Sequence, residues 1–116
     1  MLKKIMLGAL CALWVGAAQA HIKLSASLPA EGAQLANAPT QLQLDYSGEV
    51  RPVRITLKDQ SGRALDFGFK PSTKAAASFS WALPQVVPGN YEVRWIVIGG
   101  DGHKMKGQFS FTVADN

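Results

Sequence analysis

The sequence predicts an all-β chain, a seven-stranded Greek-key β-sandwich of immunoglobulin-like architecture, and three observations lead to this fold class. Beyond residue 20, apolar side chains recur at every second position, which is the period of a half-buried strand and not of a helix. Groups of Gly, Pro, Asn and Asp interrupt these runs at intervals of about eight to twelve residues. The chain after residue 20 is about a hundred residues long, which suits one domain with a modest core.

Each expected strand ends at residues that favour a turn. Gly and Asn tolerate positive φ, and Pro fixes φ for a bend. Tyr91, which follows Pro88-Gly89-Asn90 at the start of a strand, is the expected residue of a tyrosine corner. The large aromatic residues are expected in the core, and not in a ligand cage. The expected strands are 22–28, 41–46, 53–58, 65–69, 77–81, 91–98 and 108–113, and the expected core aromatics are Phe67, Phe69, Phe79, Trp81, Trp95, Phe109 and Phe111.

Residues 1–20 are predicted to be a cleaved secretory signal peptide. Lys3 and Lys4 form a basic start, residues 5–17 an apolar stretch, and Ala18-Gln19-Ala20 a small-x-small cleavage site. The apolar stretch is shorter than the roughly 20 residues that span a bilayer. Cleavage after Ala20 would leave one mature domain, 21–116, with His21 as its first residue.

Charge and cysteine content exclude several functions. Without Lys3 and Lys4, the twelve basic residues become ten, against eight acidic residues, and they are dispersed along the sequence. We therefore expect a solvated surface and no nucleic-acid or membrane binding. The predicted mature domain has no cysteine, so a metal would have to use nitrogen, oxygen or thioether ligands.

The chain has two histidines, His21 and His103. If consecutive strands alternate in direction, the first strand begins at the end where the second connection (47–49) and the sixth (99–102) also lie. This topology would bring His21, Glu49 and the Asp101-Gly102-His103 loop to one end of the sandwich.

A metal site at that end has a chemical reason. The α-amine and Nδ1 of a mature N-terminal His21 would close a chelate ring, and the imidazole of His103 would add a third nitrogen. Asp101 would add a carboxylate oxygen, and such nitrogen-rich tetragonal sites suit Cu(II), with zinc as the runner-up. We expect one Cu(II) per chain. Met105 shares the strand parity of this loop, but a lone methionine on a strand usually packs, so it is left out of the site.

Several motifs together resemble the CopC family of periplasmic copper-resistance proteins. They span essentially the whole predicted mature domain: His21 after the signal, Pro29-Ala30-Glu31-Gly32, Ala38-Pro39, Leu42-x-Leu44-x-Tyr46-Ser47, Pro88-Gly89-Asn90-Tyr91-x-Val93-x-Trp95, Asp101-Gly102-His103 and Gly107-x-Phe109-Ser110-Phe111-x-Val113.

The resemblance implies a cupredoxin-like or immunoglobulin-like sandwich that binds Cu(II) through His21, Asp101 and His103. It also implies a periplasmic location. Some members carry a methionine-rich loop for Cu(I), and its absence here implies a Cu(II)-only protein. Some place a glutamate directly after the serine that corresponds to Ser47. Here Gly48 intervenes, so Glu49 is either a surface acid or an additional ligand or outer contact of the site.

The expected function is that of a monomeric periplasmic carrier that sequesters Cu(II) for copper resistance and hands it to a membrane or periplasmic transport partner. Two alternatives stay open. An N-terminal histidine brace on a β-sandwich also resembles oxidative polysaccharide-cleaving copper enzymes, and a structural or adhesive sandwich could bind metal incidentally. Hydrolytic chemistry is not expected, because a triad would have to use the same two histidines.

Overall fold

The computed structural model describes residues 21–115, and every regular element in this range is a strand. The all-β prediction is confirmed, while the predicted signal peptide at 1–20 lies outside the described residues. No helix within 21–115 has the length and hydropathy that crossing a membrane would require. The strands are β1 (Leu24–Leu28), β2 (Ala33–Leu35), β3 (Gln41–Asp59), β4 (Ala64–Leu65), β5 (Ala76–Ala82), β6 (Gly89–Gly99) and β7 (Lys104–Val113).

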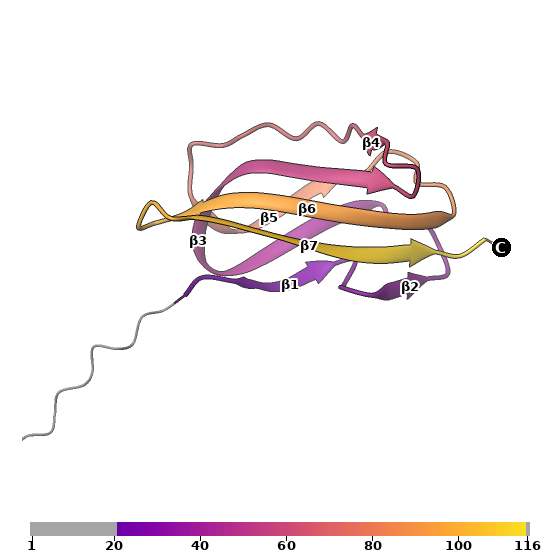
Figure 1. Cartoon of the computed structure of the whole chain (residues 1–116), viewed down its shortest axis with the longest axis horizontal. Helices are drawn as coiled ribbons and strands as arrows, with labels where there is room; N and C mark the ends of the chain where they lie inside the picture. Colours follow the sequence, from indigo (N-terminus) through magenta and orange to yellow (C-terminus); the bar gives the residue numbers. More distant parts are fainter. Residues whose placement is uncertain (1–20, 116) are drawn as a thin grey trace, which may run out of the picture.

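β3 is the central element because it takes part in both layers of the sandwich (Figure 1). Its first part, from Gln41 to Asp45, pairs with β1 on one side and β5 on the other, both antiparallel. Its second part, from Val50 to Asp59, pairs with β6, and β6 pairs with β7. β2 extends this second layer by pairing in parallel with the end of β7. The register shifts between Asp45 and Val50, where the strand bends from one layer to the other.

This bend corrects the predicted strand list. The predicted turn at 47–49 lies inside β3, so the expected strands 41–46 and 53–58 are one strand. A bulge interrupts the apolar alternation as a turn does, and the two therefore look alike in sequence. Of the expected strand 65–69, only Leu65 lies in a strand, the two-residue β4, and the three-residue β2 was not expected.

The core lies between the two layers and confirms the alternating pattern. Inward residues of β3, β6 and β7 are almost fully buried, whereas Phe67, Phe69, Phe79 and Trp81 are half-buried and pack against this core and one another. The Tyr91 hydroxyl donates a hydrogen bond to the Val87 carbonyl, so the predicted tyrosine corner is confirmed. The buried hydrophobic residues are Leu42, Leu44, Tyr46, Val50, Ile55, Leu57, Val86, Tyr91, Val93, Trp95, Val97, Phe109, Phe111 and Val113.

Candidate metal centre

The segment that leads into β1 is fixed to the bend of β3. The backbone N–H of Lys23 donates to the Ser47 hydroxyl at 3.0 Å, and the N–H of Ser47 donates to the Lys23 carbonyl at 2.8 Å. The side chain of Ile22 covers Gly48 so closely that a Cβ there would lie 3.1 Å from Ile22 Cγ1. The absence of a side chain at Gly48 therefore allows Ile22 to pack against the bend.

Ile22 also reaches the end of β6. A Cβ built on Gly99 would lie 3.5 Å from Ile22 Cδ1 and 3.3 Å from Asp101 Oδ1. The side chain of Ile22 and the carboxylate of Asp101 therefore both lie close to the same glycine. Because His21 directly precedes Ile22, this packing brings the predicted N-terminal ligand to the loop that carries the other two.

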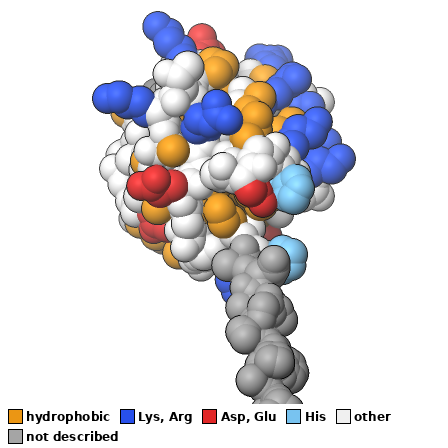
Figure 2. Space-filling model, turned by 90° about the vertical axis from the view of Figure 1, so that its left-hand side faces the viewer, with side chains coloured by type: hydrophobic (Ala, Val, Ile, Leu, Met, Phe, Trp, Pro, Cys, Tyr) orange, Lys and Arg blue, Asp and Glu red, His pale blue; other side chains and the backbone are white. Residues whose placement is uncertain are grey.

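Both histidines lie at one end of the sandwich, as the sequence predicted. Figure 2 shows this end, with the two histidine side chains in pale blue on the same face. The end is formed by the bend of β3 and by the loop between β6 and β7, whose tip is at the left of Figure 1. The prediction used an incorrect strand list, but the bend inside β3 takes the chain from one layer to the other where the turn was expected.

The loop between β6 and β7 has a defined local structure. Gly99 N–H donates to the His103 carbonyl, and Gly102 N–H donates to the Gly99 carbonyl, both at 2.9 Å. Gly102 has φ of +87°, a conformation that favours glycine. This turn places residues 101 and 103 close together at the tip.

Asp101 and His103 contact each other twice. Asp101 Oδ1 accepts a hydrogen bond from the backbone N–H of His103 at 3.0 Å, and Oδ2 lies 2.9 Å from His103 Nδ1. The His103 side chain is 82% exposed and that of Asp101 is 65% exposed, so an ion could reach both from solvent. Since Nδ1 faces the carboxylate, Nε2 of His103 is the nitrogen left without this contact.

The carboxylate is held in its charged form. The hydrogen bond from the His103 backbone N–H lowers the pKa of Asp101 below its ordinary value of 3.8, and the nearby His103 side chain lowers it further. Asp101 is therefore ionised at neutral pH and can balance the charge of a bound cation.

The other candidate residues do not join this pair. Within residues 21–115, no group of three or more His, Cys, Asp or Glu side chains is arranged to hold a metal ion. Glu49 is exposed in the bend of β3, and none of the hydrogen bonds and ion pairs found in 21–115 connects it to Asp101 or His103. Asp101 and His103 form a two-residue donor pair, and the three predicted ligands share an end of the molecule without forming a closed cluster.

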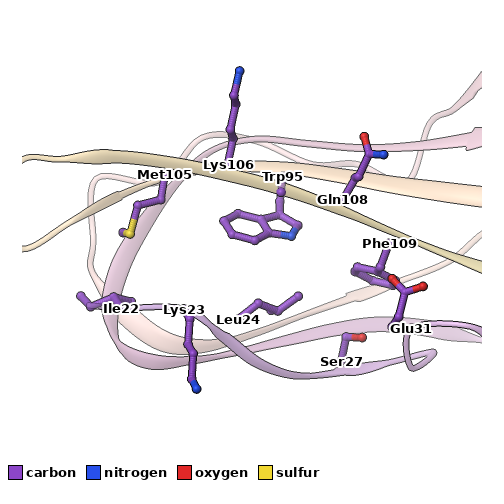
Figure 3. A pocket seen from close by; sticks show the side chains of 11 residues that line it. Ile22, Lys23, Leu24, Ser27, Glu31, Trp95, Met105, Lys106, Gln108 and Phe109 are labelled. Atoms are coloured by element: carbon purple, nitrogen blue, oxygen red, sulfur yellow. The ribbon is translucent and has the colours of Figure 1, made fainter. Parts of the chain in front are cut away.

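Met105 lines a groove between β1 and β7 that Ile22 also lines. The groove has a volume of about 570 Å³ and an apolar wall that includes Leu24, Trp95 and Phe109 (Figure 3). Met105 is half-buried there, and its Cε would lie 3.1 Å from a Cβ on Gly99. This position agrees with the packing role that the sequence indicated.

Sequence reasoning missed the residues that bring the site together. Ile22, Gly48 and Gly99 carry no metal donor in their side chains, and the two glycines were interpreted as turn residues. Their sequence signal is real but ambiguous, since a glycine in a strand marks either a turn or a close approach of other atoms. The approach of Ile22 to both glycines distinguishes these possibilities, and it is visible only in three dimensions.

The chain is similar in sequence to proteins of one known family. The CopC domain matches residues 24–114, which is most of the chain. Copper resistance protein C of Xanthomonas campestris pv. juglandis is 30% identical over 104 residues, covering 81% of this chain and 80% of that protein. Protein YobA of Escherichia coli K12 is 29% identical over 98 residues, covering 81% and 79%.

Solved structures give the same result. The crystal structure of CopC from Methylosinus trichosporium OB3b has a TM-score of 0.71 with 27% identity, covering 83% of this chain and 98% of that one. PcoC from Escherichia coli, described as a methionine-rich copper resistance protein, has a TM-score of 0.62 at 22% identity, covers 81% and 99%, and supports the fold alone. The chain therefore belongs to the CopC family, as its sequence motifs predicted.

Proposed function

We propose that this protein is a periplasmic Cu(II) carrier that holds one copper ion per chain through His21, Asp101 and His103 and delivers it to a transport partner. CopC proteins are copper-binding resistance proteins and not enzymes, so the family supports copper as the cargo. One observation supports the choice of ligands. Ile22 Cδ1 and Asp101 Oδ1 both approach Gly99, and this packing supports His21, the residue before Ile22, as a ligand beside the Asp101–His103 pair.

The donor chemistry suits Cu(II). After cleavage behind Ala20, the α-amine and Nδ1 of His21 would provide two nitrogens, and the imidazole of His103 would provide a third. The ionised carboxylate of Asp101 would contribute oxygen and negative charge. This set matches the nitrogen-rich tetragonal coordination of Cu(II), which also binds such ligands more tightly than the other divalent first-row metals. We place Glu49 outside the donor set, because no contact joins it to the loop.

The exposure of the loop suits a carrier. A buried site would hold the ion firmly, whereas His103 and Asp101 are mostly open to solvent and to an incoming ligand of a partner. The histidine-brace enzyme is not favoured. Such enzymes usually offer a large flat substrate surface, and the exposed large hydrophobic residues within 21–115 are Leu28, Val53 and Val87, without an aromatic ring.

A Cu(II) titration of the secreted protein against a calibrated chelator tests this function, with electron paramagnetic resonance as the readout. Mass spectrometry first establishes that the protein begins at His21. We expect one nitrogen-rich tetragonal site per chain. A form that retains Ala20 should bind more than about 100-fold more weakly, because it lacks the amine at residue 21 and loss of even an outer contact costs 10- to 100-fold. His103→Ala should weaken binding by about 100-fold for the same reason.

The controls separate this site from incidental binding. Lys104→Ala changes the neighbouring exposed residue and should leave the copper affinity within about twofold. A parallel titration with Zn(II) tests the runner-up metal and should show weaker binding. Equal copper affinity for the forms beginning at Ala20 and at His21 would exclude the amino-terminal site.

A further inference from the structure

The outer faces of the two layers differ in charge. Outward positions of the layer formed by β1, β5 and the first part of β3 carry neutral polar side chains such as Gln43 and Ser80, and their one charged residue is Asp45. The outer face of the other layer carries six of the ten basic residues that follow position 20. We call this the basic face, and its cations are Arg51, Arg54, Lys58, Arg94, Lys104 and Lys106.

The pairing of the strands explains how this face arises. Arg51 lies opposite Ile98, which lies opposite Lys104 on the next strand. In the adjacent row, Arg54 lies opposite Ile96, which lies opposite Lys106. Residues that are dispersed in the sequence therefore form two rows, each with a cation on both sides of an isoleucine.

Little negative charge offsets these cations. Glu92 is the single acid among residues 51–58, 92–98 and 104–112, and it is paired with Arg94 at 2.8 Å. Arg54, Lys58 and Arg94 line a shallow hollow of about 280 Å³ on this face, with Ile96 beside them. Figure 2 shows several lysine and arginine side chains on the right of the view, next to a histidine, and others at its upper left.

We propose that the basic face docks the protein on an anionic phospholipid surface. Lysine and arginine clusters of this size are attracted to anionic lipid headgroups, and the attraction grows with each basic residue near the surface. The cations lie on three adjacent strands and do not converge on one point, which fits an extended layer of lipid phosphates.

A protein partner fits this face less well. A protein interface normally has an apolar centre inside a polar rim. Here Ile96 and Ile98 are half-buried, and Val53, at 38% exposure, is the one large hydrophobic residue on these strands that stands exposed. Attraction on the basic face is therefore mainly electrostatic.

Docking would place the metal loop at the lipid surface. Lys104, at the edge of the basic face, directly follows His103. The proposal goes beyond the proposed copper function and does not depend on it, because vesicle binding is measured without copper.

Cosedimentation with vesicles tests the proposal. The vesicles contain either phosphatidylcholine alone or phosphatidylcholine with about one third phosphatidylglycerol, which supplies the anionic surface. Wild-type protein should bind the anionic vesicles, should not bind the neutral ones, and should dissociate as salt is raised. The triple variant Arg51→Gln, Arg54→Gln, Lys106→Gln should bind at least about tenfold more weakly.

A second triple variant is the matched control. Arg63→Gln, Lys70→Gln, Lys74→Gln removes the same net charge from exposed residues outside β3, β6 and β7 and should bind within about twofold of wild type. All proteins share one N-terminus, checked by mass, so a difference between the variants does not come from residues 1–20. Copper titration of both variants should give wild-type affinity, which separates a failure of docking from a failure of the copper site.

Three outcomes would overturn the proposal. Equal loss of vesicle binding in both triple variants would show that binding depends on net charge alone and not on the basic face. Displacement by millimolar inorganic phosphate at constant ionic strength would assign a discrete anion site in place of a lipid surface. Absence of binding to the anionic vesicles would reject the lipid and leave an acidic protein surface as the complement of the basic face.

Discussion

Ile22 and His103 belong to the two segments that carry the proposed copper ligands, and they are held in different ways. Ile22 is fixed by tertiary packing, because it contacts glycines on β3 and β6 that are far from it in sequence. His103 is fixed locally, through its backbone and side-chain contacts with Asp101 two residues earlier. The position of Ile22 therefore depends on the whole fold, whereas the position of His103 depends on a short turn.

The difference separates fold stability from metal affinity. Substitutions in the loop should change the copper affinity and leave the fold intact, because Asp101 and His103 are exposed. Substitutions at the Ile22 contact should change both, because Ile22 packs against the core.

Among the changes discussed below, Asp101→Asn should cause the largest loss of copper affinity. The amide keeps the shape of the side chain but removes the negative charge, so we expect the Cu(II) affinity to fall by about tenfold. The thermal unfolding midpoint should not change, since the loop side chain is mostly exposed. Competition titration and thermal denaturation measure the two quantities.

Asp66→Asn is the matched control for this change. Asp66 also accepts a hydrogen bond from the backbone two residues later, at Gly68 N–H, but it lies in the segment between β4 and β5. Its replacement should leave the copper affinity within about twofold. Equal losses in the two variants would show that Asp101 has no specific role in binding.

Ile22→Ala should weaken the packed half of the site. We expect the free energy of unfolding to fall by about 1 kcal/mol, which suits removal of a half-buried side chain. The copper affinity should fall by about fivefold, because residue 21 loses the contact that positions it. Denaturant unfolding and copper competition measure these effects.

Leu24→Ala separates positioning from stability. Leu24 is also half-buried against the core, but it lies three residues beyond His21. This variant should lose a similar free energy of unfolding and keep its copper affinity within about twofold. A fall in copper affinity that follows stability in both variants would contradict a positioning role for Ile22.

Much of the fold could be predicted because alternation is a local property of the sequence. The inward residues of β6 and β7 were identified by their period, and the tyrosine corner by its position after Pro88-Gly89-Asn90. The bend in β3 could not be distinguished from a turn, because both interrupt the alternation at Ser47 and Gly48. The expected strand 65–69 has strand-like composition, but only Leu65 belongs to a ladder, the two-residue pairing of β4 with β3.

The histidines of the proposed site could be predicted because histidine is rare in this chain. The chain has only two histidines, and a correct assignment of the ends was enough to bring them together. The contacts of Ile22 with Gly48 and Gly99 join segments up to 77 residues apart, and no local pattern encodes them. The basic face was missed for the same reason, since strand pairing brings together cations that are separated in sequence.

Gly99→Ala should perturb the loop side of the site. Its Cβ would lie 3.1 Å from Met105 Cε and 3.3 Å from Asp101 Oδ1, so these two side chains would have to move by a few tenths of an ångström, whereas Ile22 Cδ1, at 3.5 Å, would be in ordinary contact. We expect about a threefold loss of copper affinity, since these neighbours can adjust. Gly100→Ala is the control, because nothing lies within 4 Å of a Cβ there. Equal affinities for these two variants would argue that Asp101 does not act through Gly99.

The smallest expected effect is the pH dependence contributed by Asp101. The backbone N–H of His103 lowers the pKa of this carboxyl below 3.8. The group therefore stabilises the folded loop above that pH, and the contribution is lost only as the pH falls through its lowered value. Copper loss at pH values above this range should then come from protons that compete at the nitrogen donors.

A carboxyl titration followed by nuclear magnetic resonance measures this directly. The Asp101 midpoint should lie below 3.8, and the His103 amide signal should shift with the same midpoint. Asp59 is an internal reference, because hydrogen bonds from Ser61 and Arg63 lower its pKa at the opposite end of the sandwich. An Asp101 midpoint at or above 3.8, with Asp59 still lowered, would show that the loop is not held by this carboxylate. The Asp101–His103 loop would then not be fixed by its own local contacts, and its contrast with the packed Ile22 segment would be smaller.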